Sequence, residues 1–500
     1  MKLTARSRLL LVLALAILSL CLSVSSASDW DTEREERGGQ SAGRQGEGEQ
    51  EQGRYSSSGR PYHYGEESFK YRTTTRHGRF RVLERFTHEL LRDSPVGDRR
   101  VAVLEAAPRA FLQPSHYDAD EVFYVREGEG VVVMLWKGKR QSFCVREGDV
   151  MVIPAGATVY SANTHDSRWF RVVMLLNPVS TPGRFGEFFP VGSGERQESF
   201  FGAFSDDILQ ASFNARKEEV EKVFEESSEG EITQAPEEQI RALSKSCSSS
   251  RGSGSGSRSE QDFKPTSIAS KKPRYSNNHG RLSEITGDEC PHLRRLDMEV
   301  GLANITRGSM MAMSYSTRAT KIAVVVEGNG YFEMACPHMS GSSSRRSERR
   351  REREQEHGSE QERRERQERE HEQSSEEERR REREQGQREG GQKSRGYRQV
   401  GANIKEGSVI VLPAAHPATF VAGGDGNLAV LCFGVGAERD EKVFLTGKNS
   451  PLRQLVEEDE AARKLVFGER AQEAEKLVRG QSDDVFVRGP RQRQSGVADM

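Results

Sequence analysis

The chain contains the same short β-rich unit twice, and this internal repeat constrains the fold more than any other feature of the sequence. The segment YVREGEGVVVMLW around Gly128 recurs 200 residues later as VVVEGNGYFEMAC around Gly328. A second segment, GDVMVIPAG from Gly148, recurs 259 residues later as GSVIVLPAA from Gly407. Because the two offsets differ by 59 residues, the second copy must carry a long insertion between two of its strands.

The pattern inside each copy predicts strands. Runs of Val, Ile, Leu, Phe and Tyr are separated by Gly, Pro and Asn, which is typical of an antiparallel sandwich or barrel. Pro154 and Pro413 follow the last apolar residues of equivalent strands and end them, because proline donates no hydrogen bond to a ladder. We therefore expect an all-β fold of two barrels.

Helical periodicity follows each copy. The segment from Asp206 to Phe224 and the segment from Ser450 to Val478 both place apolar residues on one side of a helix. The apolar residues are Ile208, Leu209, Phe213, Val220 and Phe224 in the first segment, and Leu452, Leu455, Val456, Leu465 and Val466 in the second. We expect these helical extensions to cover an open barrel end or to face another subunit.

The N-terminus predicts a secretory signal peptide. Basic residues precede an apolar run from Leu9 to Leu22, and Ser25 and Ala27 suit cleavage before Ser28. An uncleaved anchor is the alternative, but the run is shorter than the ~20 residues that a span requires. With no other long apolar segment, we expect no membrane association beyond this signal.

Composition indicates large polar segments between the barrels and around them. Only 34% of the residues are hydrophobic, and the mean hydropathy is −0.76. The predicted organisation is a signal peptide at 1–27, a disordered arm at 28–60, an N-terminal domain with its helical extension at 61–235, a flexible linker at 236–275, a C-terminal domain with its helical extension at 276–480, a disordered Arg/Glu-rich insertion at 342–395, and a tail at 481–500.

Charge argues against a nucleic-acid partner. The chain has 75 Lys and Arg against 77 Asp and Glu, a formal net charge of −2. Glu neutralises Arg locally in the Arg/Glu-rich tract, and no aromatic residues are interleaved there for base stacking. Only 17 of the 75 cationic residues are Lys, so the chain is rich in Arg, the side chain with the most nitrogen.

Five cysteines remain after the predicted signal peptide, which is too few for a disulfide scaffold in a chain of this length. At least one is free or pairs with another molecule, and the sequence leaves the pairing open. They are Cys144, Cys247, Cys290, Cys336 and Cys432.

Gly148, Pro154 and Gly156 form a motif that resembles the cupin barrel. That resemblance implies a metal held by three His and one Glu, but this chain departs from the ligand set. The matching positions are Pro114, His116, Glu121 and Val159 in the first copy, and Ser314, Ser316, Lys321 and Ala418 in the second. Two possible ligands in the first copy and none in the second cannot form a catalytic metal site. We therefore expect no enzyme.

The resemblance narrows to vicilins, the smaller class of seed storage globulin. The segments that carry it include YDADEVFYVREGEG, PGRFGEFFP, SFFGAFSDDILQASFN and FGERAQEAEKLV, spread between about Pro61 and Pro490. It implies two cupin jelly-roll barrels related by a pseudo-twofold axis, with helical extensions that join subunits into a homotrimer. It also implies delivery to the protein storage vacuole, a reserve of nitrogen and carbon, and digestion by vacuolar proteases at germination.

One group of residues has the chemistry of a metal site. Cys336 and His338 are two apart on a predicted strand and share a face, and His416 follows the neighbouring strand. Cys with two His suits copper or zinc. Some vicilins resemble this arrangement and bind copper with a Tyr from the N-terminal strand, which matches Tyr62 here, or less well Tyr64.

A structural alternative stands beside this reading. A strand Cys is commonly a small buried hydrophobe, and a His beside Pro often only completes a turn. Cys290 and His292 have the same spacing but precede the second barrel. We expect no required cofactor. The alternative function is a copper-binding vicilin-like cupin with a redox role, or one that senses a small ligand or binds a sugar.

Overall fold

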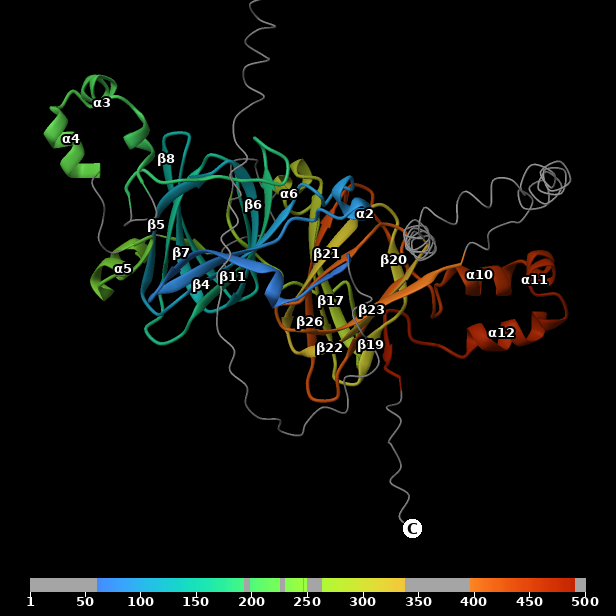
Figure 1. Ribbon diagram of the computed structural model, residues 1–500. Coiled ribbons are helices and arrows are strands. Elements are labelled where there is room, and N and C mark those ends of the chain that lie inside the picture. The colour runs from blue at the N-terminus through green and yellow to red at the C-terminus, as the bar shows by residue number, and fades with distance from the viewer. Residues whose placement is uncertain are drawn as a thin grey trace, which may run out of the picture. The chain divides into compact units, whose positions relative to one another are not determined.

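The computed structural model describes residues 61–192, 198–224, 230–245, 247–249, 263–337 and 396–490 (Figure 1). The predicted signal peptide, the predicted arm at 28–60 and the predicted insertion at 342–395 lie outside these ranges, as does His338. Within them, four seven-stranded sheets form two barrels of two sheets each. The structure therefore confirms the predicted all-β fold with two cupin barrels.

The first barrel is built from strands β2 to β14. One sheet has the order β9-β6-β11-β4-β3-β2, and the other has the order β12-β5-β10-β7-β8-β14 with β13 beside β5. The strands are β2 Phe69–Thr75, β3 Gly78–Leu83, β4 Arg100–Ala106, β5 Ala110–Tyr117, β6 Ala119–Glu127, β7 Glu129–Trp136, β8 Lys139–Arg146, β9 Asp149–Ile153, β10 Thr158–Asn163, β11 Phe170–Pro178, β12 Glu187–Phe188, β13 Ile232–Gln234 and β14 Ser248–Ser249.

The second barrel repeats this plan with strands β16 to β28. Its sheets have the orders β24-β21-β26-β18-β17-β16 and β23-β22-β25-β19-β28, with β20 and β27 paired beside β25. The strands are β16 Tyr275–Asn277, β17 Gly280–Ile285, β18 Met298–Ile305, β19 Ser309–Met311, β20 Ser314–Ser316, β21 Thr320–Glu327, β22 Asn329–Cys336, β23 Arg398–Lys405, β24 Val409–Leu412, β25 Ala418–Ala422, β26 Leu428–Val435, β27 Lys442–Phe444 and β28 Phe486–Arg488.

Two short strands are exchanged between the barrels. Strand β1 (His63–Tyr64) precedes the first barrel but pairs with β24 of the second. Strand β15 (Thr266–Ser267) precedes the second barrel but pairs with β9 of the first. Since β9 and β24 are the equivalent edge strands of the two repeats, each barrel covers the open edge of the other, which removes an exposed pairing edge.

The pleat of β6 shows how one strand serves two cores. Val122 and Tyr124 belong to the large core that continues into the second barrel, whereas Phe123 and Val125 belong to the core inside the first barrel. Alternate side chains of a strand point to opposite faces, so both faces of this strand are buried. A strand buried on both faces has a continuous apolar run. The side chains of β6 that point into the first barrel are at odd-numbered positions, and Glu121 is one of them.

A close backbone contact explains why both repeats have Gly at the turn after this strand. Gly128 and Gly328 have φ values of +81° and +82°. A Cβ atom on Gly128 would lie 2.2 Å from the carbonyl oxygen of Trp169, and one on Gly328 would lie 1.9 Å from that of Asn427. No larger residue fits without moving the neighbouring strand, β11 in the first barrel and β26 in the second.

Helices follow each barrel, as the sequence predicts, and two short helices also lie between barrel strands. The first helical segment is interrupted at Asn214, which adopts the left-handed conformation with φ +48° and ends one helix before the next begins. The helices are α2 Glu89–Arg92, α3 Asp206–Phe213, α4 Lys217–Phe224, α5 Glu237–Ser244, α6 Pro291–Arg295, α10 Pro451–Glu458, α11 Glu460–Phe467 and α12 Ala471–Arg479, with 3-10 turns η1 Glu66–Ser68, η3 Phe200–Ala203 and η5 Gly468–Arg470.

Regular structure lies in two segments that the sequence assigned to a linker and a tail. Helix α5 and strands β14 and β15 lie in the predicted linker at 236–275, and β28 lies in the predicted tail at 481–500. The reason is local burial: Ile240 of α5, Ile268 beside β15 and Phe486 of β28 are all buried in hydrophobic clusters. None of the helices in the described ranges is long and apolar enough to span a membrane.

Candidate functional sites in the two barrels

The structure brings two of the four predicted metal ligands into contact. The hydroxyl oxygen of Tyr62 lies 3.6 Å from the sulfur of Cys336, and both side chains are fully buried. Tyr62 is placed there by the strand exchange, because its carbonyl accepts a 2.9 Å hydrogen bond from the Val411 amide of β24. Burial, followed by the hydrogen bond to Cys336, raises the pKa of Tyr62.

His416 lies in the loop between β24 and β25 and is buried. Its Nδ1 atom is 2.9 Å from the carbonyl oxygen of Ala414. The next residue, Pro417, accepts a 2.9 Å hydrogen bond from the amide of Ala335, directly before Cys336. The loop of His416 therefore runs beside the end of β22, where the predicted ligand Cys336 stands.

Ala415 shapes this loop. It has φ +60°, a left-handed conformation that the equivalent Gly156 of the first barrel adopts with φ +76°. Ala at this position is strained, yet the loop is kept in place by a 2.8 Å hydrogen bond from the Ala415 amide to the carbonyl of Ser316.

The donor chemistry of this group fits copper. A thiolate, an imidazole and a phenol are ligands that copper accepts, and the described members lie on adjoining backbone segments. In the described ranges no group of three His, Cys, Asp or Glu residues is placed to hold a metal ion. His338, the fourth predicted ligand, lies outside those ranges.

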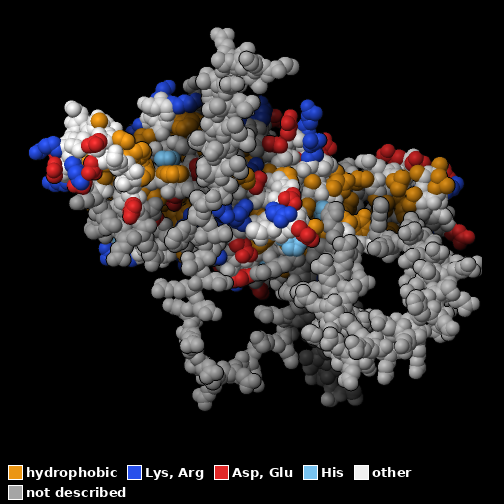
Figure 2. Space-filling view, turned by 45° about the horizontal axis from the view of Figure 1, so that its top comes forward, with side chains coloured by type: hydrophobic (Ala, Val, Ile, Leu, Met, Phe, Trp, Pro, Cys, Tyr) orange, Lys and Arg blue, Asp and Glu red, His pale blue; other side chains and the backbone are white. Residues whose placement is uncertain are grey.

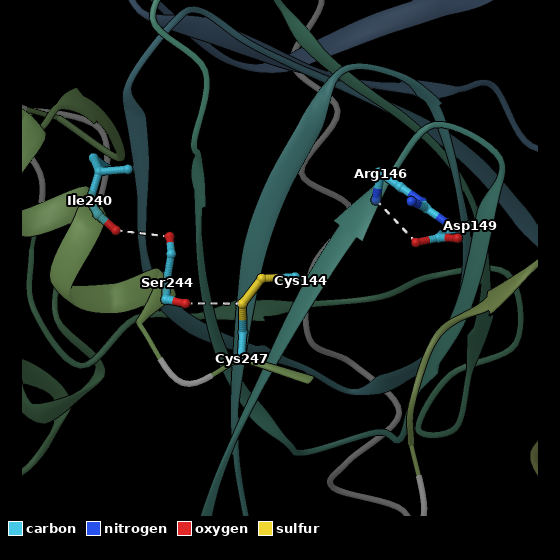
Figure 3. The surroundings of a disulfide bond; sticks show 6 residues. All are labelled: Cys144, Arg146, Asp149, Ile240, Ser244 and Cys247. Carbon is cyan, nitrogen blue, oxygen red and sulfur yellow. Dashed lines mark hydrogen bonds between the residues drawn. A yellow bond between two sulfur atoms is a disulfide. The ribbon is translucent and has the colours of Figure 1, made fainter. Parts of the chain in front are cut away.

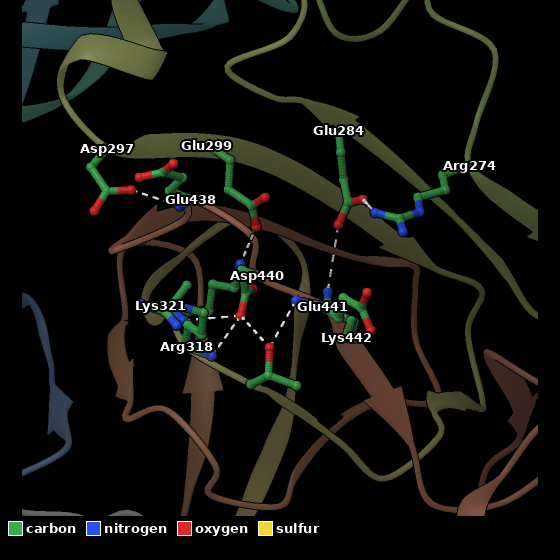
Figure 4. A network of polar contacts seen from close by, with 12 residues as sticks. Arg274, Glu284, Asp297, Glu299, Arg318, Lys321, Glu438, Asp440, Glu441 and Lys442 are labelled. Carbon is green, nitrogen blue, oxygen red and sulfur yellow. Dashed lines mark hydrogen bonds and ion pairs between the residues drawn. The ribbon is translucent and has the colours of Figure 1, made fainter.

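The equivalent of the cupin metal site in the second barrel holds an ion-pair network instead (Figure 4). Lys321 lies 3.1 Å from a carboxylate oxygen of Asp440 and also pairs with Glu299. Burial alone would lower the pKa of Lys321, but the charges of Glu299 and Asp440 outweigh it and raise that pKa. The side-chain ammonium of Lys321 thus remains charged inside this barrel.

The remaining altered positions of the second barrel lie around this ammonium. Ser314 pairs with Ala418 in the ladder, and both residues line the same cavity as Lys321 and His416. Neither a hydroxyl nor a methyl group replaces the lost imidazoles as a strong transition-metal ligand. The residues that replace the cupin metal ligands in the second barrel therefore line one cavity.

In the first barrel, His116 and Glu121 line an internal cavity of about 90 Å³. The ring of His116 stacks on Phe188 with centroids 4.9 Å apart, and burial lowers the pKa of its imidazole. Val159, at the position of the missing His, lines the same cavity. Pro114, at the position of the other missing His, has no side-chain atom that could bind a metal.

Cys144 of β8 and Cys247 form a disulfide, with Cα atoms 5.2 Å apart (Figure 3). Cys247 follows α5, and its sulfur lies 3.2 Å from the carbonyl oxygen of Ser244, whose hydroxyl in turn donates to Ile240. The bond ties the segment after α5 to the barrel. The sequence left this pairing open, since 103 residues separate the two cysteines.

Comparison with known proteins decides the family. The Cupin family model matches residues 97–221 and 266–465, one segment for each barrel. A vicilin of Juglans regia is 38% identical over 467 residues, which cover 91% of this chain and 83% of that protein. The chain belongs to the vicilin-like 7S globulins of the cupin superfamily.

Other relatives match along almost the whole chain. A protein named Cupincin from Oryza sativa subsp. indica is 63% identical over 462 residues, covering 91% of this chain and 93% of that protein. The crystal structure of the Corylus avellana vicilin superposes with a TM-score of 0.70 at 35% identity, covering 86% of this chain and 100% of that one. The predicted resemblance to vicilins is confirmed.

Proposed function

We propose that this 7S globulin is a non-catalytic seed storage protein, a reserve of nitrogen and carbon that is mobilised at germination. The observation that carries the proposal is the vicilin relationship across both barrels. The altered cupin site supports it, because Lys321 and its carboxylate partners occupy the position where a catalytic metal would need open ligands. The predicted signal peptide and storage-vacuole destination belong to the same proposal.

Composition gives the proposal its physical basis. The chain has 75 Lys and Arg residues, of which only 17 are Lys, so Arg carries much side-chain nitrogen. Glu beside Arg limits self-repulsion and permits dense packing. The well-packed barrels resist proteolysis, whereas polar segments such as 342–395 would give vacuolar proteases their first points of cleavage.

The test is the fate of the chain during development. We expect it to accumulate during seed filling and to disappear within seedling establishment, with early cleavage in the Arg/Glu-rich segment. Immunoblots and mass spectrometry of staged seed and leaf extracts measure this. Constant low abundance in leaf, without loss at germination, would contradict the proposal.

We also propose that the chain assembles as a homotrimer through its helical extensions. Leu465 of α11 and Leu477 of α12 are 87% and 77% exposed in the single chain. Figure 2 shows hydrophobic side chains gathered over the helical end that contains α10 to α12. Burial of one Leu side chain contributes about 1.5 to 3 kcal/mol, so an assembly contact here is strongly favoured.

Light scattering tests the trimer. We expect the mass of three chains for the wild type and of one chain for the double variant Leu465→Asp, Leu477→Asp, because charge would then enter an apolar contact. Gln472→Asp, on the exposed side of α12, is the matched control and should stay trimeric. A monomeric wild type would contradict the proposed assembly.

The contact between Tyr62 and Cys336 favours a second function, copper binding by Cys336, His338, His416 and Tyr62. Native protein should then contain about one copper per chain, and His416→Ala should lose most of it. His88→Ala, at an exposed His of the first barrel, is the control. Elemental analysis that finds little copper, unchanged by His416→Ala, would remove this function and leave the storage proposal intact.

A further inference from the structure

The cavity inside the first barrel has an acidic lining. Its acidic side chains come from β6, β12 and the segment before β13, and its walls are largely apolar, with Phe80 and Phe123 among them. No Lys or Arg side chain in the described ranges lines it. The polar residues that face it include Ser115, His116, Tyr117, Glu121, Glu187 and Glu231.

Two of these carboxyl groups have hydrogen-bond donors. Glu187 accepts a hydrogen bond from the hydroxyl of Ser115 at 3.3 Å and another from Tyr117. Glu231 accepts a hydrogen bond from the hydroxyl of Thr73. Arg72 is a positive charge near Glu187, but it does not line the cavity.

Glu121 differs from both. It is only 9% exposed, and its carboxyl group lines the cavity without a hydrogen bond to any side chain or amide of the described chain. The charges that act on it are those of Glu187 and Asp120, which have the same sign. Burial, followed by these two charges, raises the pKa of Glu121 to about 8. An ammonium group placed beside this carboxyl group would favour its charged form and supply the opposite charge that its neighbours Glu187 and Asp120 do not.

In the second barrel the chain itself supplies an ammonium group at this place in the fold. Lys321 occupies the position equivalent to Glu121, because Glu121 pairs with Ile153 and Leu176 while Lys321 pairs with Leu412 and Gly434 of the matching strands. Three acidic residues around Lys321 have cationic partners: Glu299 and Asp440 pair with Lys321, and Glu284 pairs with Arg274 and Lys442.

We propose that the cavity of the first barrel binds a small organic cation, a protonated primary amine with a short alkyl chain. The ammonium group would pair with Glu121 and Glu187, taking the role that the Lys321 ammonium has in the second barrel. The alkyl chain would pack against the apolar wall formed by residues such as Phe80 and Phe123. A cavity of about 90 Å³ has room for a few heavy atoms.

Two other ligand classes fit less well. A carboxylate would bring a further negative charge beside Glu121 and Glu187. A divalent metal needs several oxygen or nitrogen ligands around one point, and the described residues contain no group of three acidic, His or Cys side chains so placed. The inference is independent of the storage role, because a reserve protein needs no ligand.

Titration calorimetry on the full-length mature protein tests the inference with n-butylamine hydrochloride as the probe. We expect saturable binding of one amine per chain, and no comparable heat from n-butanol or sodium butyrate. Glu121→Gln should weaken amine binding by about tenfold or more, equal to 1.4 kcal/mol, since it removes the carboxylate that would pair with the ammonium while keeping the shape. Glu129→Gln, an exposed residue of β7, should bind like the wild type.

Other outcomes would overturn the inference. Equal binding of butanol and butylamine, unaffected by Glu121→Gln, would show an apolar cavity with no cation preference. Binding of butyrate, or of calcium in place of the amine, would assign another ligand class. Glu187→Gln is the second substitution, and it is combined with Glu121→Gln. If this double variant folds with the wild-type circular dichroism spectrum and retains full amine affinity, the proposed pairing is wrong.

Discussion

The variant Lys321→Met is expected to destabilise the second barrel by about 3 to 5 kcal/mol, because it leaves Glu299 and Asp440 buried without a cation. The Lys321 side chain is 9% exposed and that of Asp440 is 3% exposed, so water cannot replace the lost ammonium. Urea unfolding followed by far-ultraviolet circular dichroism measures the loss. Fluorescence is less suitable, since Trp136 and Trp169 both lie in the first barrel.

The loss should depend on pH in a defined window. Burial would raise the pKa of Asp440, but the charge of Lys321 and the hydrogen bonds to the carboxylate lower it below the ordinary 3.8. The stabilisation is therefore present above pH 3.8 and disappears as pH falls through the lowered value. The pKa of Lys321 is raised, so on the basic side the stabilisation is complete below its ordinary 10.5.

A matched surface variant separates charge from burial. Lys464 of α11 pairs with Glu460, but both side chains are about two-thirds exposed, at 66% and 67%. Lys464→Met should change the free energy of unfolding by less than about 1 kcal/mol. If Lys321→Met costs no more than this control, the network in the second barrel does not stabilise the fold.

The second large effect should come from the disulfide. The double variant Cys144→Ala, Cys247→Ala opens a loop that spans 103 residues, and cross-linking a loop of about 100 residues stabilises by roughly 4.7 kcal/mol in the chain-entropy model. We expect a loss of about 3 to 5 kcal/mol in urea unfolding, together with faster hydrogen exchange in α5.

Reduction provides the internal control for this experiment. Dithiothreitol should bring the wild type close to the double variant and should leave the variant itself unchanged. The variant Cys432→Ala changes a partly buried cysteine outside any disulfide and should retain the response to the reductant. A wild type whose stability is insensitive to dithiothreitol would show that the bond contributes little.

The repeated unit allowed the two barrels to be predicted, because each position of the repeat has a physical reason that recurs. Gly128 and Gly328 avoid the same carbonyl contact, and Pro154 and Pro413 end equivalent strands. The exchange of β1 and β15 could not be predicted, since a strand of two residues has no periodicity and its partner is set by tertiary packing.

The candidate sites were predictable to different degrees. The loss of cupin ligands was visible at Lys321, but its partners were not, because Asp440 lies 119 residues away in the sequence. Tyr62 and Cys336 are 274 residues apart, and their pairing followed from the resemblance to vicilins alone. The acidic cavity was missed because Glu187 and Glu231 lie in short segments whose place against β5 only the fold determines.

Isotope labelling tests the storage role most directly. Seeds are filled on ¹⁵N nitrate and germinated on unlabelled nitrogen, and the labelled chain and free amino acids are quantified by mass spectrometry. We predict that the labelled chain is lost during seedling establishment while its ¹⁵N, Arg nitrogen above all, appears in seedling amino acids. Persistence of the intact labelled chain after the seedling is established would contradict its function as a reserve.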